Sequence, residues 1–123
     1  MKKVKVAISA LAASALVLTA APAHSADPGV TDDSIVLGIQ LPQTGPASPG
    51  YNKVDGAMRA YFDYVNSKGG VYGRKITLVS KDDKYSAGIT ISTASQLINS
   101  DQVFAMVGDV GTQTHAAVIR DLN

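Results

Sequence analysis

Residues 54–79 read VDGAMRAYFDYVNSKGGVYGRKITLV and decide the fold class. Apolar side chains recur there at helical spacing and form one stripe, made of Val54, Ala57, Met58, Tyr61, Phe62 and Val65. The glycine pair at 69–70 predicts the helix end, because glycine readily takes the left-handed conformation that closes a helix. Residues 75–79 then form a β-branched, apolar run typical of a strand. We expect the Tyr and Phe of the stripe to be core residues.

The same alternation of helix and strand continues along the chain in both directions. Residues 35–39 (IVLGI) predict a buried parallel strand over 35–40, and residues 41–50 predict a loop because they hold three prolines and two glycines. Downstream, the pattern predicts a helix over 86–99 and a strand over 103–107. The expected apolar positions of that helix are Ile91, Ala94, Ser95 and Ile98.

A third helix is expected to begin near Thr114 or His115, with Val118, Ile119 and Leu122 as its apolar face. The resulting order is β-α-β-α-β-α. When each strand is followed by a helix that leads to the next strand, the connections are right-handed crossovers and the sheet is parallel and covered on both faces. The predicted fold class is therefore α/β, a doubly wound parallel sheet. We expect the sheet to be incomplete, because the third helix is cut off one or two turns in.

Residues 1–25 have the organisation of an export signal. Lys2, Lys3 and Lys5 precede an uncharged apolar run over residues 6–21, and small residues follow at positions suited to cleavage after Ala23 or Ser25. The apolar run is too short to span a bilayer comfortably, since about 20 residues are needed. We therefore expect a signal peptide over 1–25, a mature domain over 26–123, and a location in the periplasm or outside the cell.

Composition excludes several classes of protein. The chain has 46% hydrophobic and 17% charged residues, which is ordinary for a globular fold, and no cysteine, so a disulfide framework is impossible. Without the three lysines of the leader, 8 of the 11 Lys and Arg remain against 10 Asp and Glu, a net charge of −2. Because no basic cluster remains, nucleic acid is a poor candidate partner.

The best candidate site follows the third predicted strand, in residues 108–114 (GDVGTQT). Ligands of open parallel sheets lie beyond the carboxyl ends of the strands. Unpaired N–H groups near Gly111, Thr112, Gln113 and Thr114 would face outward at the positive end of a helix dipole, and the two threonine hydroxyls could also donate to a carboxylate. An equally weighted alternative makes Thr114 only an N-cap and Gly111 only a turn.

Residues 45–52 (GPASPGYN) share the glycine spacing of a phosphate-binding P-loop but lack its chemistry. Tyr51 stands where lysine is required and Asn52 where serine or threonine is required, so a nucleotide-hydrolysing P-loop protein is excluded. Tyr51 could instead present an aromatic wall and a hydroxyl to a small ligand. The alternative is that it packs on its own helix.

The remaining polar residues do not predict a cofactor or a metal. Asp82 and Asp83 follow the second strand, but with no histidine or third carboxylate nearby a capped turn is favoured over a metal or acid–base site. His24 and His115 have no cysteine partners. Asp109 invites comparison with a response-regulator phosphoacceptor, but the first strand ends in Gln40-Leu41-Pro42 rather than in acidic residues.

Four segments together resemble one family. They are residues 35–46, the stretch NSKGGVYGR at 66–74, Lys81-Asp82-Asp83, and Val107-Gly108 with its threonine-containing loop. They are similar to the leucine/isoleucine/valine-binding proteins, type I periplasmic substrate-binding proteins of ABC transporters. The similarity covers essentially the whole mature chain.

This resemblance implies a function. Two α/β lobes close on an amino acid and deliver it to ABC permease subunits at the membrane, with no reaction catalysed. It implies that Thr112 contacts the ligand α-carboxylate, with Gln113 and Thr114 in the same loop, and that the loop around Tyr51 can contact the ligand side chain. Family members have about three times as many residues, so we expect a fragment here and a monomer at full length.

Two alternatives remain at this point. A ligand-sensing receptor or regulator of the same fold would share these features. A small flavodoxin-like enzyme would need a phosphate-binding turn after the first strand, which the proline-rich residues 41–50 do not supply.

Overall fold

A computed structural model describes residues 27–122. The predicted export signal, residues 1–25, lies outside the described residues. The elements run in the order β1 (Ser34–Leu41), α1 (Ser48–Tyr51), α2 (Val54–Ser67), β2 (Lys75–Asp82), α3 (Ala87–Asn99), β3 (Ala105–Met106) and α4 (Thr112–Val118). No helix within these residues is long and apolar enough to cross a membrane.

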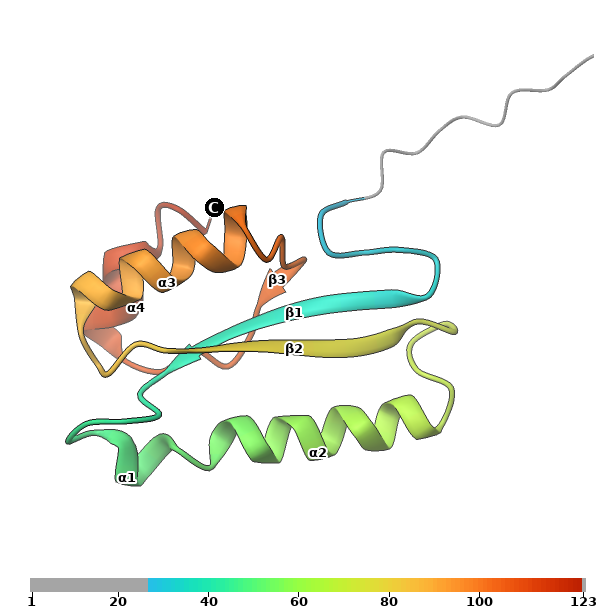
Figure 1. Ribbon diagram of the computed structural model, residues 1–123, viewed down its shortest axis with the longest axis horizontal. Coiled ribbons are helices and arrows are strands. Elements are labelled where there is room, and N and C mark those ends of the chain that lie inside the picture. The colour runs from blue at the N-terminus through green and yellow to red at the C-terminus, as the bar shows by residue number, and fades with distance from the viewer. Residues whose placement is uncertain (1–26, 123) are drawn as a thin grey trace, which may run out of the picture.

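The three strands form a parallel sheet in the order β2-β1-β3. β1 pairs along its whole length with β2, from Ser34 opposite Lys75 to Leu41 opposite Asp82, whereas β3 pairs with β1 at two positions only. Helix α2 covers one face of the sheet, and α3 and α4 cover the other (Figure 1). The predicted α/β class with a parallel sheet is confirmed.

Several predicted boundaries were wrong. The loop predicted over 41–50 overlaps the short helix α1. Pro49 favours this helix, because proline fits the first turn of a helix. β2 continues to Asp82 because it stays paired with β1, so Asp82 ends the strand rather than following it. β3 has two residues instead of five, and α4 begins at Thr112 instead of 114 or 115.

The α2 side of the sheet holds an apolar core. Ile39, Leu41 and Leu78 are buried there, and Val54, Met58 and Phe62 of α2 pack against them. No residue of α2 itself is fully buried.

The expectation that both aromatic residues of the α2 stripe lie in the core was wrong for Tyr61. Its side chain is 63% exposed, and Ala57 is exposed as well. The helix contacts the sheet through the narrower row that contains Val54, Met58 and Phe62, so residues 57 and 61 fall on its flank.

Of the positions predicted to face inward on α3, only Ala94 is fully buried, and the other buried residues differ from the prediction. The buried residues of α3 are Thr90, Thr93, Ala94 and Leu97, whereas Ile91 is 47% exposed and Ser95 is exposed. The threonines can turn inward because their hydroxyls are paired. Thr93 donates to Gln40 Oε1 at 2.9 Å, and Thr90 shares its hydroxyl proton between the Ser86 carbonyl at 2.8 Å and Asp83 Oδ2 at 3.2 Å. The helix and the inward position of Ala94 were predicted correctly, but Ile91 and Ser95 were wrongly expected to face inward.

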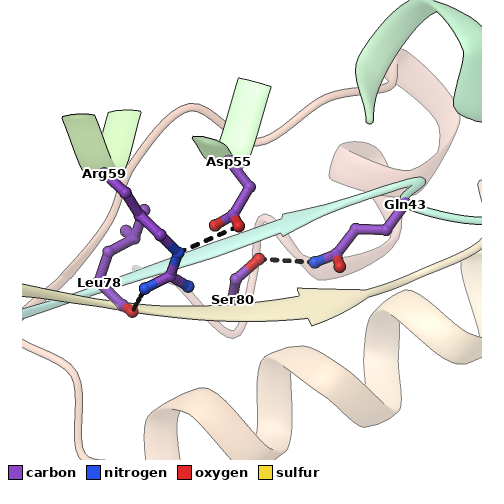
Figure 2. A network of polar contacts seen from close by, with 5 residues as sticks. All are labelled: Gln43, Asp55, Arg59, Leu78 and Ser80. Atoms are coloured by element: carbon purple, nitrogen blue, oxygen red, sulfur yellow. Dashed lines mark hydrogen bonds and ion pairs between the residues drawn. The ribbon is translucent and has the colours of Figure 1, made fainter. Parts of the chain in front are cut away.

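The outer edge of β2 is closed by side chains of α2. Asn66 accepts from the Ile76 N–H at 2.7 Å and donates to the Ile76 carbonyl at 2.8 Å, as a neighbouring strand would. Arg59 donates to the Leu78 carbonyl at 2.9 Å while it pairs with Asp55 at 3.1 Å (Figure 2). These contacts satisfy strand groups that would otherwise offer a pairing edge.

Candidate functional site

The carboxyl ends of the strands gather at one end of the molecule, where α1 and the start of α4 also lie (Figure 1). Three connections leave the sheet there: residues 42–47, residues 83–86 and residues 107–111. The strand order reverses direction at β1, since β2 lies on one side of it and β3 on the other. In parallel sheets the crevice at such a reversal is where ligands bind.

The connection from β3 to α4 presents the predicted anion-binding segment. Gly111 precedes the helix with φ 115°, a conformation that favours glycine, and its carbonyl accepts the first helical hydrogen bond from His115 at 2.8 Å. Thr112 and Gln113 are exposed. Within residues 27–122, the backbone N–H groups of residues 112–114 have no acceptor. They are among the N–H groups that the first turn of a helix leaves without an intrahelical partner.

Thr114 has a different place from the one expected. It is buried, and its hydroxyl donates to the Val110 and Gly111 carbonyls at 3.0 and 3.1 Å. The N-cap alternative for Thr114 was wrong because the helix begins earlier and Gly111 occupies the cap position. Since its hydroxyl proton is already donated inward, Thr114 stabilises the turn that presents Thr112.

Tyr51 is the last residue of α1, and its side chain is 38% exposed. Because α1 lies on the α2 side of the sheet and α4 on the opposite side (Figure 1), Tyr51 belongs to a separate wall of this end of the molecule. The structure thus holds Gly111, Thr112, Gln113 and Thr114 in one turn at the start of α4 and places Tyr51 on a different element, α1.

Asp82 anchors two of the three connections. Its carboxylate accepts from the backbone N–H groups of Gln43 at 2.9 Å and Lys84 at 3.0 Å, and from the hydroxyl of Thr44. Desolvation acts to raise the pKa of Asp82, but the hydrogen bonds from Thr44, Lys84 and Gln43 together hold it below its ordinary value. The capped turn is the interpretation that these contacts support.

Asp109 ties the β3–α4 connection to the central strand. Its Oδ1 accepts from the Gln40 backbone N–H at 3.0 Å. Burial raises the pKa of Asp109, and this hydrogen bond and the nearby His115 offset the rise only in part. Gln40 itself is buried, and its Nε2 has no hydrogen-bond partner among the described residues.

Tyr85, to which the sequence alone assigns no individual role, lies beside the α4 loop. A Cβ placed on Gly111 would be 2.8 Å from Cε2 of the Tyr85 ring, so ring and loop backbone are in contact. Lys84 and Tyr85 both have positive φ, 52° and 59°. No sequence pattern indicates this conformation, because residues other than glycine rarely adopt it.

A family model confirms what this architecture indicates. The model that describes periplasmic binding proteins matches residues 34–123. The chain belongs to the periplasmic binding protein family. The match spans every described strand and helix, and it agrees with the resemblance noted in the sequence.

Individual relatives extend this periplasmic binding protein assignment. An amino acid binding protein of Pseudomonas aeruginosa is 37% identical over 75 residues, which cover 60% of this chain and 20% of that protein. A fatty acid ABC transporter substrate-binding protein from Thermomonospora curvata is 34% identical with a TM-score of 0.73, covering 78% of this chain and 24% of that one. A possible leucine/isoleucine/valine-binding protein from Rhodopirellula baltica is 26% identical with a TM-score of 0.67, covering 80% and 26%.

This member of the family therefore spans about a quarter of the length of the relatives that it matches. Within residues 27–122, no three His, Cys, Asp or Glu side chains gather in a way that could hold a metal ion.

Proposed function

We propose that this chain forms the N-terminal part of the first lobe of an extracytoplasmic solute-binding protein that serves an ABC importer. The proposed ligand is a branched-chain amino acid or a similar small carboxylate or amide. The observation that carries the proposal is the β3–α4 connection, where free N–H groups at residues 112–114 and the exposed hydroxyl of Thr112 converge at the carboxyl end of a periplasmic-binding-protein sheet.

Each residue of the proposed site has a distinct role. Gly111 lets the backbone turn into α4 and leaves room for close approach, and Thr112 donates its hydroxyl and N–H to the ligand carboxylate. Gln113 adds its N–H and an exposed amide, while Thr114 holds the turn from beneath. Tyr51 contributes an aromatic contact from α1.

The relatives support a ligand that joins a carboxylate to an apolar body. One is named for leucine, isoleucine and valine and another for fatty acids, and both ligand classes share that chemistry. A fatty acid is thus a second candidate ligand, favoured by the higher identity and TM-score of the Thermomonospora protein.

The proposed cellular role follows from the family and the leader. Residues 1–25 direct export and residues 26–123 belong to the binding domain, which acts as a monomer when joined to its second lobe. Its partners are the small-molecule ligand and the permease subunits at the membrane. The predominantly hydrogen-bonding site and the family of binding proteins support a role in binding rather than catalysis.

A thermal-shift titration tests this proposal. The protein is expressed from its native locus with its natural C-terminus and titrated with L-leucine, L-isoleucine, L-valine, short amides, aromatic acids and decanoate. A ligand at 100 times its Kd stabilises the folded state by about 2.7 kcal/mol. We expect a shift with at least one apolar carboxylate.

Thr112→Ala is the decisive variant, because Thr112 is exposed and its replacement should leave the fold intact. We expect at least about a tenfold loss of affinity, the usual effect of removing a hydrogen bond to a charged group. Ser92→Ala, which removes an exposed hydroxyl from α3, is the matched control. A well-folded protein that shifts with none of these compounds would contradict the proposed function.

A further inference from the structure

Tyr85 is held in an unfavourable backbone conformation by a buried carboxylate. Lys84 and Tyr85 are consecutive residues with φ of 52° and 59°. These values lie in the left-handed region, which most residues other than glycine and asparagine avoid. The Tyr85 N–H donates to Asp83 Oδ1 at 2.9 Å, and Asp83 is fully buried and fixed from α3 by the Thr90 hydroxyl. Residues in such conformations persist where the surrounding structure enforces them, and they cluster at ligand sites.

The conformation directs the ring toward the β3–α4 connection. One edge of the ring, Cδ2 and Cε2, lies against the backbone of Gly111, the residue before Thr112. The side chain is nevertheless 41% exposed, so only part of the ring is covered by the loop. An aromatic surface therefore lies open next to the N–H groups proposed to bind a carboxylate.

A second tyrosine, Tyr72, has the same backbone conformation but lies at the other end of the sheet, away from the site. Tyr72 also has a positive φ, 50°, but it lies in the turn before β2, and its side chain is 96% exposed. It belongs to the turn closed by the pairing of Val71 with Arg74. Only Tyr85, of these two, combines the left-handed backbone with packing against the site.

We propose that Tyr85 is a specificity-determining residue whose ring forms an apolar wall of the ligand site. It selects carboxylates that carry an apolar body, because such a body can cover the open part of the ring while the carboxylate lies on residues 112–114. This inference rests on the proposed function and adds the residue that favours apolar ligands.

Tyr85→Asn is the sharpest test. Asparagine tolerates the left-handed region, so the turn is retained while the ring is removed. The protein with its natural C-terminus is titrated calorimetrically with L-leucine, L-phenylalanine and decanoate. For each probe that the wild type binds, we expect Kd to rise about tenfold or more, the effect of losing an aromatic contact of ordinary size. Tyr72→Asn is the matched control and should bind as the wild type does.

Two further measurements separate the ring from the fold around it. Tyr85→Phe keeps the apolar ring and should bind within about threefold of the wild type. In the wild-type protein, brief nitration with tetranitromethane followed by peptide mass spectrometry should show Tyr85 protected by saturating probe and Tyr72 unprotected. This second measurement requires no variant to fold.

The outcomes distinguish this inference from the proposed function. If Tyr85→Asn binds as tightly as the wild type, or if Tyr85 nitrates equally with and without probe, the apolar wall is wrong. If Thr112→Ala loses affinity in the same experiments, the proposed function still stands. If the wild type binds none of the three probes or the other compounds of the thermal-shift panel, both are wrong.

Discussion

The two faces of the sheet are built differently. On the α2 side, Ile39, Leu41 and Leu78 of the strands are buried beneath helix residues that are themselves only half-buried. On the α3 and α4 side, buried apolar residues such as Leu97 and Val118 alternate with buried polar ones. These polar residues are Gln40, Asp83, Thr90, Thr93 and Thr114.

The polar face leads to the candidate site. Thr90 fixes Asp83, which holds Tyr85, and Thr114 fixes the turn that presents Thr112. The buried residues of the apolar face are all hydrophobic, whereas buried polar residues of the other face hold particular loops in place. Satisfied buried polar groups specify one arrangement more strictly than apolar contact does, because an unpaired partner is costly.

The largest expected effect on stability comes from a residue at the centre of the polar face, the side of the sheet that α3 and α4 cover. Leu97→Ala should lower the free energy of unfolding by about 3 kcal/mol, because Leu97 is fully buried and the cavity cannot collapse. On the apolar face, Met58→Ala should cost about 1 kcal/mol, since Met58 is only partly buried. Urea unfolding of the purified protein measures both values.

Ile91→Ala is the control for this pair. Ile91 lies on the exposed side of α3, so the loss should stay within about 0.5 kcal/mol. A loss for Ile91→Ala equal to that for Leu97→Ala would show that the helix is rotated from its described orientation.

The next effect tests the hydroxyls beneath the site. Thr90→Val keeps the shape of the side chain but leaves the buried Asp83 without its α3 donor, and we expect a loss of about 2 kcal/mol. Ligand affinity should fall as well, because Asp83 positions Tyr85. Unfolding and calorimetry on the same variant measure the two effects, with Ser92→Ala as control. Unchanged stability would contradict the role given to the hydroxyl.

The smallest expected effect concerns Asp109. Burial raises its pKa above the ordinary value of 3.8, so the charged carboxylate costs stability at neutral pH, and the cost disappears as pH falls below that value. Asp109→Asn keeps an acceptor for the Gln40 N–H and should raise stability at pH 7 by less than about 1 kcal/mol. The wild type and the variant should converge below pH 4. A stability gap that widens on acidification would contradict this sign.

Much of the fold was predictable because local patterns agree with it. The stripe from Val54 to Val65 and the glycines at 69–70 predicted α2 and its end, and the run at 35–39 predicted the first strand, although not its central place in the sheet. The segment that starts α4 was also identified, although the helix begins at Thr112 rather than two or three residues later. Asn66 belongs to the stretch at 66–74 that resembles the family, and the structure gives it a role there: its side chain closes the edge of β2.

The sequence by itself determined the parallel sheet and the order of its strands and longer helices, because these depend on periodicity and glycine placement. It also led to the proposal that residues 111–114 bind an anion, which depends on the geometry of strand ends. Only the tertiary structure decided which face of α3 is buried, since Thr90 and Thr93 turn inward once Asp83 and Gln40 are there to accept their protons. It alone placed Tyr85 against Gly111, because a left-handed tyrosine is favoured by no local preference and is held by a buried carboxylate and its partner on another helix.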